Sequence, residues 1–197
     1  MKKQTSILFL GVLFFSFITF TNPTNNYRLT ENFSMKIIGS SNVHDWESTI
    51  DSISGSAAIS LDDMGNIQIS SCQVTIPVKS IKSSKGKRMD KKTMKALNEK
   101  EFPTITYELE SFNQVEKSED GFTAQTVGSL SIAGTTKSIE MTITGDKTDD
   151  GLLEIFGKKD MLMTDFNIKP PKALLGTMKT RDEITVEFRV TLDQPNN

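Results

Sequence analysis

Apolar and polar residues alternate without a break in Ile184-Thr185-Val186-Glu187-Phe188-Arg189-Val190-Thr191-Leu192-Asp193. Successive side chains of a β-strand point to opposite faces, so this pattern predicts a strand with one face in an apolar core and the other in water. The same period of two recurs upstream, around residues 33–37, 53–59, 104–109, 122–132 and 139–143. The chain is therefore predicted to be all-β.

About eight such runs follow one another, and most are joined by short turns, which favours an antiparallel meander. A sheet of this length tends to close on itself because closure removes its edges, so we expect an eight-stranded closed barrel. A two-sheet β-sandwich is the alternative. The inward-facing parity switches within residues 67–78, and this switch predicts a β-bulge near Ser70-Ser71.

Residues 79–100 break the strand pattern and hold nine basic residues against two acids. We expect a short helix at about residues 90–98 in this long loop, with Asp90 as its cap and with Met94 and Leu97 on its buried side. Such a segment would cover one mouth of the barrel. Its basic side chains would contact an anionic membrane surface, or they would simply form a solvated face; the candidates for contact are Lys91, Lys92 and Lys95.

The stretch Ser40-Ser41-Asn42-Val43-His44-Asp45-Trp46 contains the only histidine and the only tryptophan. An imidazole beside a carboxylate suggests catalysis, but adjacent residues on a strand point to opposite faces and do not form a base and its orienting group. We therefore interpret the stretch as a corner between two strands. There Ser41, Asn42 and Asp45 would satisfy backbone groups, and Trp46 would plug one end of the core.

The chain begins with Lys2 and Lys3, followed by an apolar run over residues 7–20 that is short for a membrane-spanning helix. This pattern predicts a signal peptide at residues 1–22, cleavage, and a periplasmic or secreted protein; an uncleaved N-terminal anchor is the alternative. The remainder, residues 27–193, is long enough for one domain with a core of its own.

Composition excludes several classes of function. A net charge of −2 argues against a nucleic-acid binder. Cys72 is the only cysteine, so no internal disulfide forms, and no cluster of cysteine and histidine offers a metal site or calls for a cofactor. The sequence also has no glycine-rich phosphate loop and no serine nucleophile elbow, so we expect no enzymatic activity and assign no catalytic residue.

Several stretches together resemble the YceI-like family of exported polyisoprenoid-binding proteins, over roughly residues 27–192. The resemblance is carried by the order and spacing of residues 39–46, Thr75-Ile76-Pro77-Val78 with Ser80-Ile81, Arg88 with Asp90, residues 102–107, and residues 128–137. It implies a lipocalin-like extended barrel that holds a long apolar chain, such as an isoprenoid or quinone tail. The family offers no established catalytic residues to carry over.

The expected function is therefore non-enzymatic binding or transport of an amphipathic lipid inside the barrel. Small inward residues at Gly55, Ala57, Ala124 and Gly128 could leave room for a ligand, or they could only permit strand bending. The alternatives are an envelope stress or interaction protein with a filled barrel and, last, an enzyme acting on a lipid. The oligomeric state stays open, a homodimer included. Candidate lining residues are Trp46, Ala57, Phe102, Tyr107, Phe122, Ala124, Leu130, Met141 and Phe188.

Overall fold

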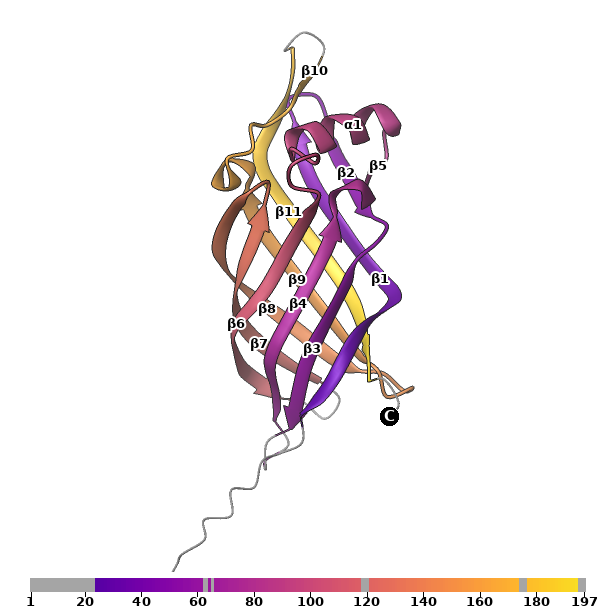
Figure 1. The fold of residues 1–197 in the computed structure, drawn as a ribbon, viewed down its shortest axis with the longest axis vertical. Helices are drawn as coiled ribbons and strands as arrows, with labels where there is room; N and C mark the ends of the chain where they lie inside the picture. The colour runs from indigo at the N-terminus through magenta and orange to yellow at the C-terminus, as the bar shows by residue number, and fades with distance from the viewer. Residues whose placement is uncertain (1–23, 62–63, 65, 118–120, 174–176, 195–197) are drawn as a thin grey trace, which may run out of the picture.

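A computed structural model describes residues 24–61, 64, 66–117, 121–173 and 177–194 (Figure 1). The predicted signal peptide at residues 1–22 lies outside the described residues. The described chain contains a long barrel with a short helix, α1, across one end (Figure 1). Its strands are β1 (Asn25–Ser41), β2 (Asp45–Ile50), β3 (Ser54–Leu61), β4 (Ile67–Pro77), β5 (Ile81–Ser83), β6 (Thr104–Lys117), β7 (Gly121–Ile132), β8 (Thr135–Lys147), β9 (Leu153–Leu162), β10 (Lys172–Ala173) and β11 (Met178–Asp193).

Eight of these strands close the barrel, in the order β1, β3, β4, β6, β7, β8, β9 and β11, with β11 pairing back onto β1. Every pairing is antiparallel, so the predicted eight-stranded closed barrel is confirmed and the two-sheet sandwich is excluded. β1 pairs with β3 through its first residues and with β2 through its last ones. β2 in turn pairs with β5, which leads into α1 (Lys87–Ala96).

Two local features follow the sequence closely. Ala58 pairs with Ser71 and Ile59 with Ile69, so Ser70 is the extra residue of the predicted bulge. Residues Ala133 and Gly134 have φ of 48° and 80° and join β7 to β8 in a tight turn. Both angles are positive, as a two-residue hairpin turn that matches the twist of its strands requires.

The predicted short helix is confirmed, but its bounds and its cap differ from the prediction. α1 spans Lys87–Ala96 rather than residues 90–98, and its N-cap is Gly86, whose φ of 83° suits glycine. Asp90 does not cap this helix. It lies in the first turn, is buried, and accepts a hydrogen bond of 2.8 Å from the Ser83 backbone amide. The carboxylate therefore ties α1 to the end of β5, a role that depends on tertiary contact and not on helix position.

The predicted corner is the turn between β1 and β2. The Ser41 hydroxyl accepts hydrogen bonds from the amides of Val43 at 3.2 Å and His44 at 3.1 Å. Asn42 accepts a bond of 2.8 Å from the Lys179 amide and so joins the turn to β11. The His44 side chain is exposed, with Nδ1 3.3 Å from the Ser41 hydroxyl.

Trp46 lies across Gly39 on the facing strand. A Cβ atom at Gly39 would be 2.2 Å from the indole, and Trp46 Nε1 donates to the Ser40 carbonyl at 3.1 Å. The indole also packs against the upper of two apolar clusters, which includes Ile50, Ile81, Ile105 and Leu130. Trp46 therefore fills the α1 end of the core because Gly39 leaves space for its ring.

Gly39→Ala should lower the free energy of unfolding by about 1–3 kcal/mol, because the added methyl group overlaps the Trp46 ring. Ser40→Ala is the matched control. It keeps the carbonyl that Trp46 uses and should shift stability by less than about 0.5 kcal/mol. In a Trp46→Leu background the cost of Gly39→Ala should shrink, as chemical denaturation of all four proteins can measure. An equal cost in both backgrounds would contradict this account.

Candidate functional site

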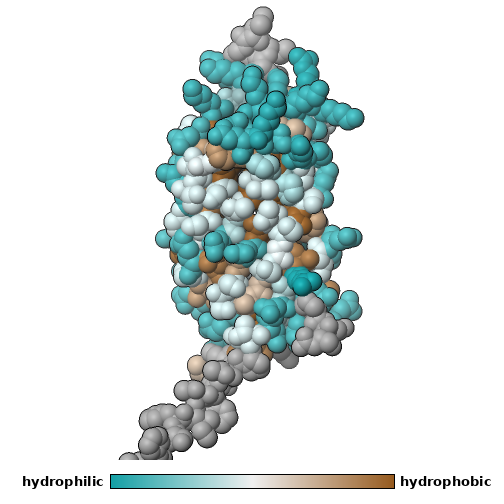
Figure 2. Space-filling view, viewed as in Figure 1, coloured by the Kyte–Doolittle hydropathy of each residue, from teal (hydrophilic) through white to brown (hydrophobic). Residues whose placement is uncertain are grey.

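The barrel encloses a cavity of about 490 Å³. Ligand pockets in proteins commonly measure about 300–1,000 Å³, so the space suits one small or chain-like molecule. Inward-facing residues of all eight barrel strands contribute to its wall, and most of them are apolar. On the face drawn in Figure 2, apolar colour shows between the paler residues of the barrel wall, and hydrophilic side chains gather over the α1 end.

Large side chains close the end of the barrel away from α1. The lower apolar cluster includes Phe122, Ala124 and Leu153, none of which lines the cavity. Phe112 and Phe122 meet edge to face, with ring centroids 5.8 Å apart and an interplanar angle of 69°. Such contacts stabilise the pair beyond simple burial, so this end is packed as a core.

The cavity reaches solvent near α1, where its lining includes the exposed residues His44 and Lys85. α1 contributes Met89, Lys92 and Thr93, with Ala96 and Leu97 at the end of the helix. Met94 and Leu97 are half-buried against the upper cluster, as predicted. The described geometry thus makes α1 a cover over one mouth of the barrel.

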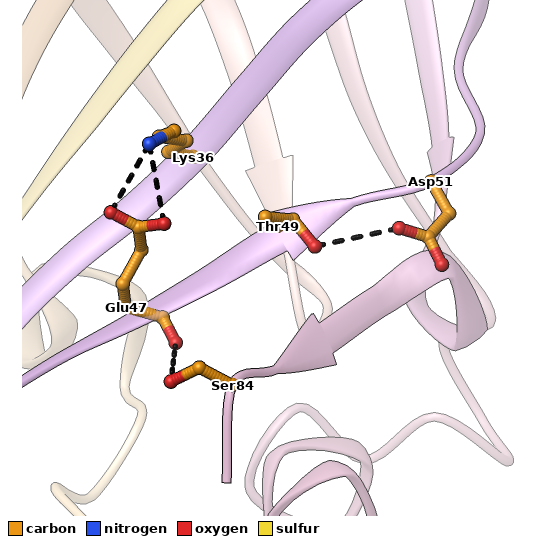
Figure 3. A network of polar contacts seen from close by, with 5 residues as sticks. All are labelled: Lys36, Glu47, Thr49, Asp51 and Ser84. Carbon is orange, nitrogen blue, oxygen red and sulfur yellow. Dashed lines mark hydrogen bonds and ion pairs between the residues drawn. The ribbon is translucent and has the colours of Figure 1, made fainter. Parts of the chain in front are cut away.

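Figure 3 shows how the segment before α1 is held to β2. The Ser84 hydroxyl donates a long hydrogen bond, 3.4 Å, to the Glu47 carbonyl, and the Glu47 carboxylate lies 3.3 Å from the Lys36 ammonium. The Thr49 hydroxyl donates to Asp51 at 3.4 Å on the same outer face. These exposed contacts contribute little individually, so the Asp90–Ser83 bond is the better-protected link to α1.

Three lysines line the cavity, namely Lys85, Lys92 and Lys159, and no aspartate or glutamate among the described residues does so. Lys92 and Lys159 are half-buried, and Lys85 is exposed. Lys91 and Lys95 are exposed on α1 and do not line the cavity. The electrostatic character of the cavity is therefore positive, although its walls are apolar.

A few uncharged polar groups lie inside the barrel. The Thr126 hydroxyl donates to the Met141 carbonyl at 3.1 Å. The neighbouring Tyr107 hydroxyl is enclosed and has no partner in hydrogen-bond geometry among the described residues, and burial raises the pKa of Tyr107. Burial also raises the pKa of the Cys72 thiol from its ordinary 9.0 to about 11. These groups interrupt the apolar wall without forming a catalytic arrangement.

The structure places most of the predicted lining residues around the cavity: Trp46, Ala57, Tyr107, Leu130, Met141 and Phe188. Phe122 and Ala124 lie in the packed end instead. Phe102 covers the turn between β7 and β8, where a Cβ atom at Gly134 would be 2.4 Å from its ring. The sequence did not show that Phe102 covers this turn, because the contact joins residues that are far apart in the chain.

The inward glycines do not leave room for a ligand. A Cβ atom at Gly128 would be 2.5 Å from the Tyr107 ring, and one at Gly55 would be 2.7 Å from Leu29. These small residues instead accommodate large neighbours, and only Ala57 of the four small positions lines the cavity. The space comes from the width of the barrel rather than from a row of glycines.

The prediction missed several lining groups. Met35, Ile76 and Ile139 follow the period-two pattern and could have been included by parity alone. Lys85, Lys92 and Lys159 could not, because charge in a strand or loop normally indicates solvent. Among the described residues no group of three or more histidine, cysteine, aspartate or glutamate side chains is placed to hold a metal ion. No helix in the described ranges is long and apolar enough to cross a membrane.

A closed eight-stranded antiparallel barrel with an internal apolar cavity, covered at one end by a helix, defines a lipocalin-like class of protein. The sequence matches the YceI-like domain over residues 20–192, and the chain therefore belongs to the YceI-like domain family. The resemblance seen in the sequence is confirmed. No match was found among curated protein sequences.

Solved structures share the fold. A polyisoprenoid binding domain from Saccharophagus degradans, implicated in plant cell wall breakdown, is 12% identical with a TM-score of 0.65, covering 86% of this chain and 98% of that one. BcnA from Burkholderia cenocepacia is 17% identical with a TM-score of 0.64, covering 81% and 95%. The Campylobacter jejuni YceI protein is 17% identical with a TM-score of 0.58, covering 76% and 85%.

Cys72 should react slowly with a polar disulfide reagent at pH 8, because burial keeps the thiol protonated until the pH approaches about 11. Its pKa is higher in the folded than in the unfolded protein, so the stability it contributes is present below pH 9.0 and is lost as the pH rises towards 11. Thiol titration with and without denaturant measures the first effect. Equal rates in folded and unfolded protein would contradict the burial.

Proposed function

We propose that this protein binds one long-chain apolar amphiphile, such as an isoprenoid or a quinone, inside its barrel and carries it without chemical change. The single observation that supports the proposal most strongly is the cavity of about 490 Å³ with apolar walls. A side chain or ligand gains about 0.8 kcal/mol for each CH₂ group it buries. A chain that fills the barrel therefore binds through its length, with little need for specific polar contacts.

The cavity favours this function over that of an interaction protein with a filled barrel. Catalysis would need a positioned base, nucleophile or metal. The described cavity wall instead contains an exposed histidine, His44, and a thiol, Cys72, whose raised pKa disfavours the nucleophilic thiolate. Both features support a carrier rather than an enzyme acting on a lipid.

The proposal includes export to the periplasm or beyond the cell, after removal of residues 1–22. There a carrier would exchange its ligand with a membrane. Lys91 and Lys95 point into solvent from the helix that covers the mouth, and Lys92 lies between them on the cavity side. Basic side chains around an apolar opening attract anionic lipid headgroups, so the α1 end is the proposed site of transient membrane contact.

Ala57→Phe should weaken binding of a fluorescent polyene fatty acid by about tenfold or more, because the new ring occupies the cavity that Ala57 lines. Ala58→Phe is the matched control, since the next residue of β3 points to the outer face. Fluorescence titration and thermal unfolding of both variants test the prediction. Equal affinity in a folded Ala57→Phe protein would show that the cavity is not the binding site.

Lys91→Glu/Lys95→Glu should slow transfer of the same fatty acid from anionic vesicles, most clearly at low salt, where screening is weak. Both side chains are exposed, so stability should change little. Lys117→Glu/Lys147→Glu is the control, because it makes the same change in net charge at the opposite end of the barrel. Stopped-flow transfer rates that are equal for both double variants would exclude a specific role for α1.

A further inference from the structure

The ladder between β8 and β9 covers only part of the two strands. Their ladder runs from Lys147 paired with Leu153 to Ile143 paired with Gly157, and no pair is formed beyond it. Yet β8 extends to Thr135, paired on its other edge with β7, and β9 extends to Leu162, paired on its other edge with β11. Beyond Ile143 and Gly157 the facing edges of β8 and β9 therefore form no ladder pairs with each other.

This seam, defined by residues 135–142 of β8 and 158–162 of β9, has clear limits. At one end the Phe188 ring packs over Gly157, where a Cβ atom would be 2.2 Å away. At the other end the 3-10 helix η2 (Met163–Phe166) contacts both strands, and the Asn167 side chain donates to the Thr135 hydroxyl at 3.0 Å. The seam is thus bounded by packed structure and is not a frayed end.

Lys159 lies across the seam. Its ammonium donates a hydrogen bond of 2.7 Å to the Glu140 carbonyl on β8, a backbone acceptor that has no ladder partner on β9. The same side chain lines the cavity, as do Ile139, Met141 and Met161 around it. All four are half-buried, whereas Ile143 and Ile155 below the seam are buried, so the wall is more open here.

Within the described ranges no carboxylate forms an ion pair with Lys159. The neighbouring Lys158 forms an ion pair with Glu187 at 3.3 Å on the outer face, and Asp160 accepts a bond from the Thr185 hydroxyl. Among the described lining residues Lys159 is the only charged one that comes from a barrel strand. An ammonium has three donors, so the carbonyl of Glu140 leaves capacity for an anionic acceptor.

We propose that the seam between β8 and β9 is the subsite for an acidic head group, a carboxylate or phosphate, which Lys159 binds while the apolar chain of the same molecule lies in the barrel. The inference rests on the proposed function and names the class of ligand. A hydrogen bond between an ammonium and an anion is about twice as strong as one between neutral groups, so Lys159 would give preference for an acid over a neutral lipid. Glu140 and Lys158 beside Lys159 are exposed, so a head group bound there would lie near solvent while the chain stays enclosed.

The test compares cis-parinaric acid with its methyl ester, both followed by fluorescence titration at pH 8. Lys159→Met should weaken binding of the acid by about tenfold or more and leave the ester within about twofold. Lys159→Arg should retain binding of the acid because it keeps the positive charge. Lys159→Gln provides a second neutral variant that keeps a donor for the Glu140 carbonyl, in case Lys159→Met fails to fold.

Lys158→Met is the matched control, with the same change of charge on the outer face of β9, and should bind both ligands as the parent does. Unchanged binding of the acid by folded Lys159→Gln would overturn the subsite. So would a loss found instead in Lys85→Met or Lys92→Met, which would place the head group at the mouth. Failure of the parent to bind either ligand would overturn the proposed function itself.

Competition with inorganic phosphate distinguishes a site for a lipid head group from a site for a free anion. Phosphate at millimolar concentration should not displace cis-parinaric acid from the parent, because it lacks the chain that the barrel encloses. Displacement that requires Lys159 would assign the seam to a free anion and overturn the inference.

Discussion

The pairing of β11 with β1 is the constraint on which the rest of the structure depends. It joins the last strand to the first, over Arg28–Asp193 to Ser41–Thr180, and so closes the ring of eight strands, in which β8 and β9 are paired over only part of their length. Once the sheet is closed, the period-two alternation determines which face of each strand points inward, namely the apolar one. Closure also fixes the width of the barrel, and the rings of Phe112 and Phe122 fill part of that width at the end away from α1.

The two ends consequently differ in chemistry. At the end away from α1, Phe112 and Phe122 pack as a core. At the other end β1 leaves β3 to pair with β2, and the chain inserts η1 (Val78–Ser80), β5 and α1 before it returns to the barrel at β6. The helix is held by Asp90 and by apolar contacts of Met94 and Leu97 rather than by a ladder. A cover attached in this way can open without breaking the barrel, which suits a carrier that must admit and release a chain.

The sequence predicts those parts of the fold that depend on local order. Alternation located most of the strands, and the change of parity located the bulge at Ser70. Contacts between residues far apart in the sequence could not be predicted. Phe102 covers Gly134, Asp90 binds Ser83 and glycines face aromatic rings only because the fold brings them together. The cavity could not be predicted either. Parity shows which residues face inward, but it does not show which of them contact one another and which leave space between them.

Lys159 departs from the alternation of apolar and polar residues along β9, and the proposed subsite explains why. The inward parity of β9 runs through Leu153, Ile155, Gly157, Lys159 and Met161, so the pattern requires an apolar residue where the lysine stands. The Lys159 side chain is half-buried, and its ammonium donates one hydrogen bond, to the Glu140 carbonyl. Methionine, as at position 161, would fill the site at lower cost. Departures from consistent patterning tend to mark functional positions, and this one lies just beyond the end of the β8–β9 ladder. The proposed preference of the cavity for an acidic ligand therefore accounts for a lysine at this inward position.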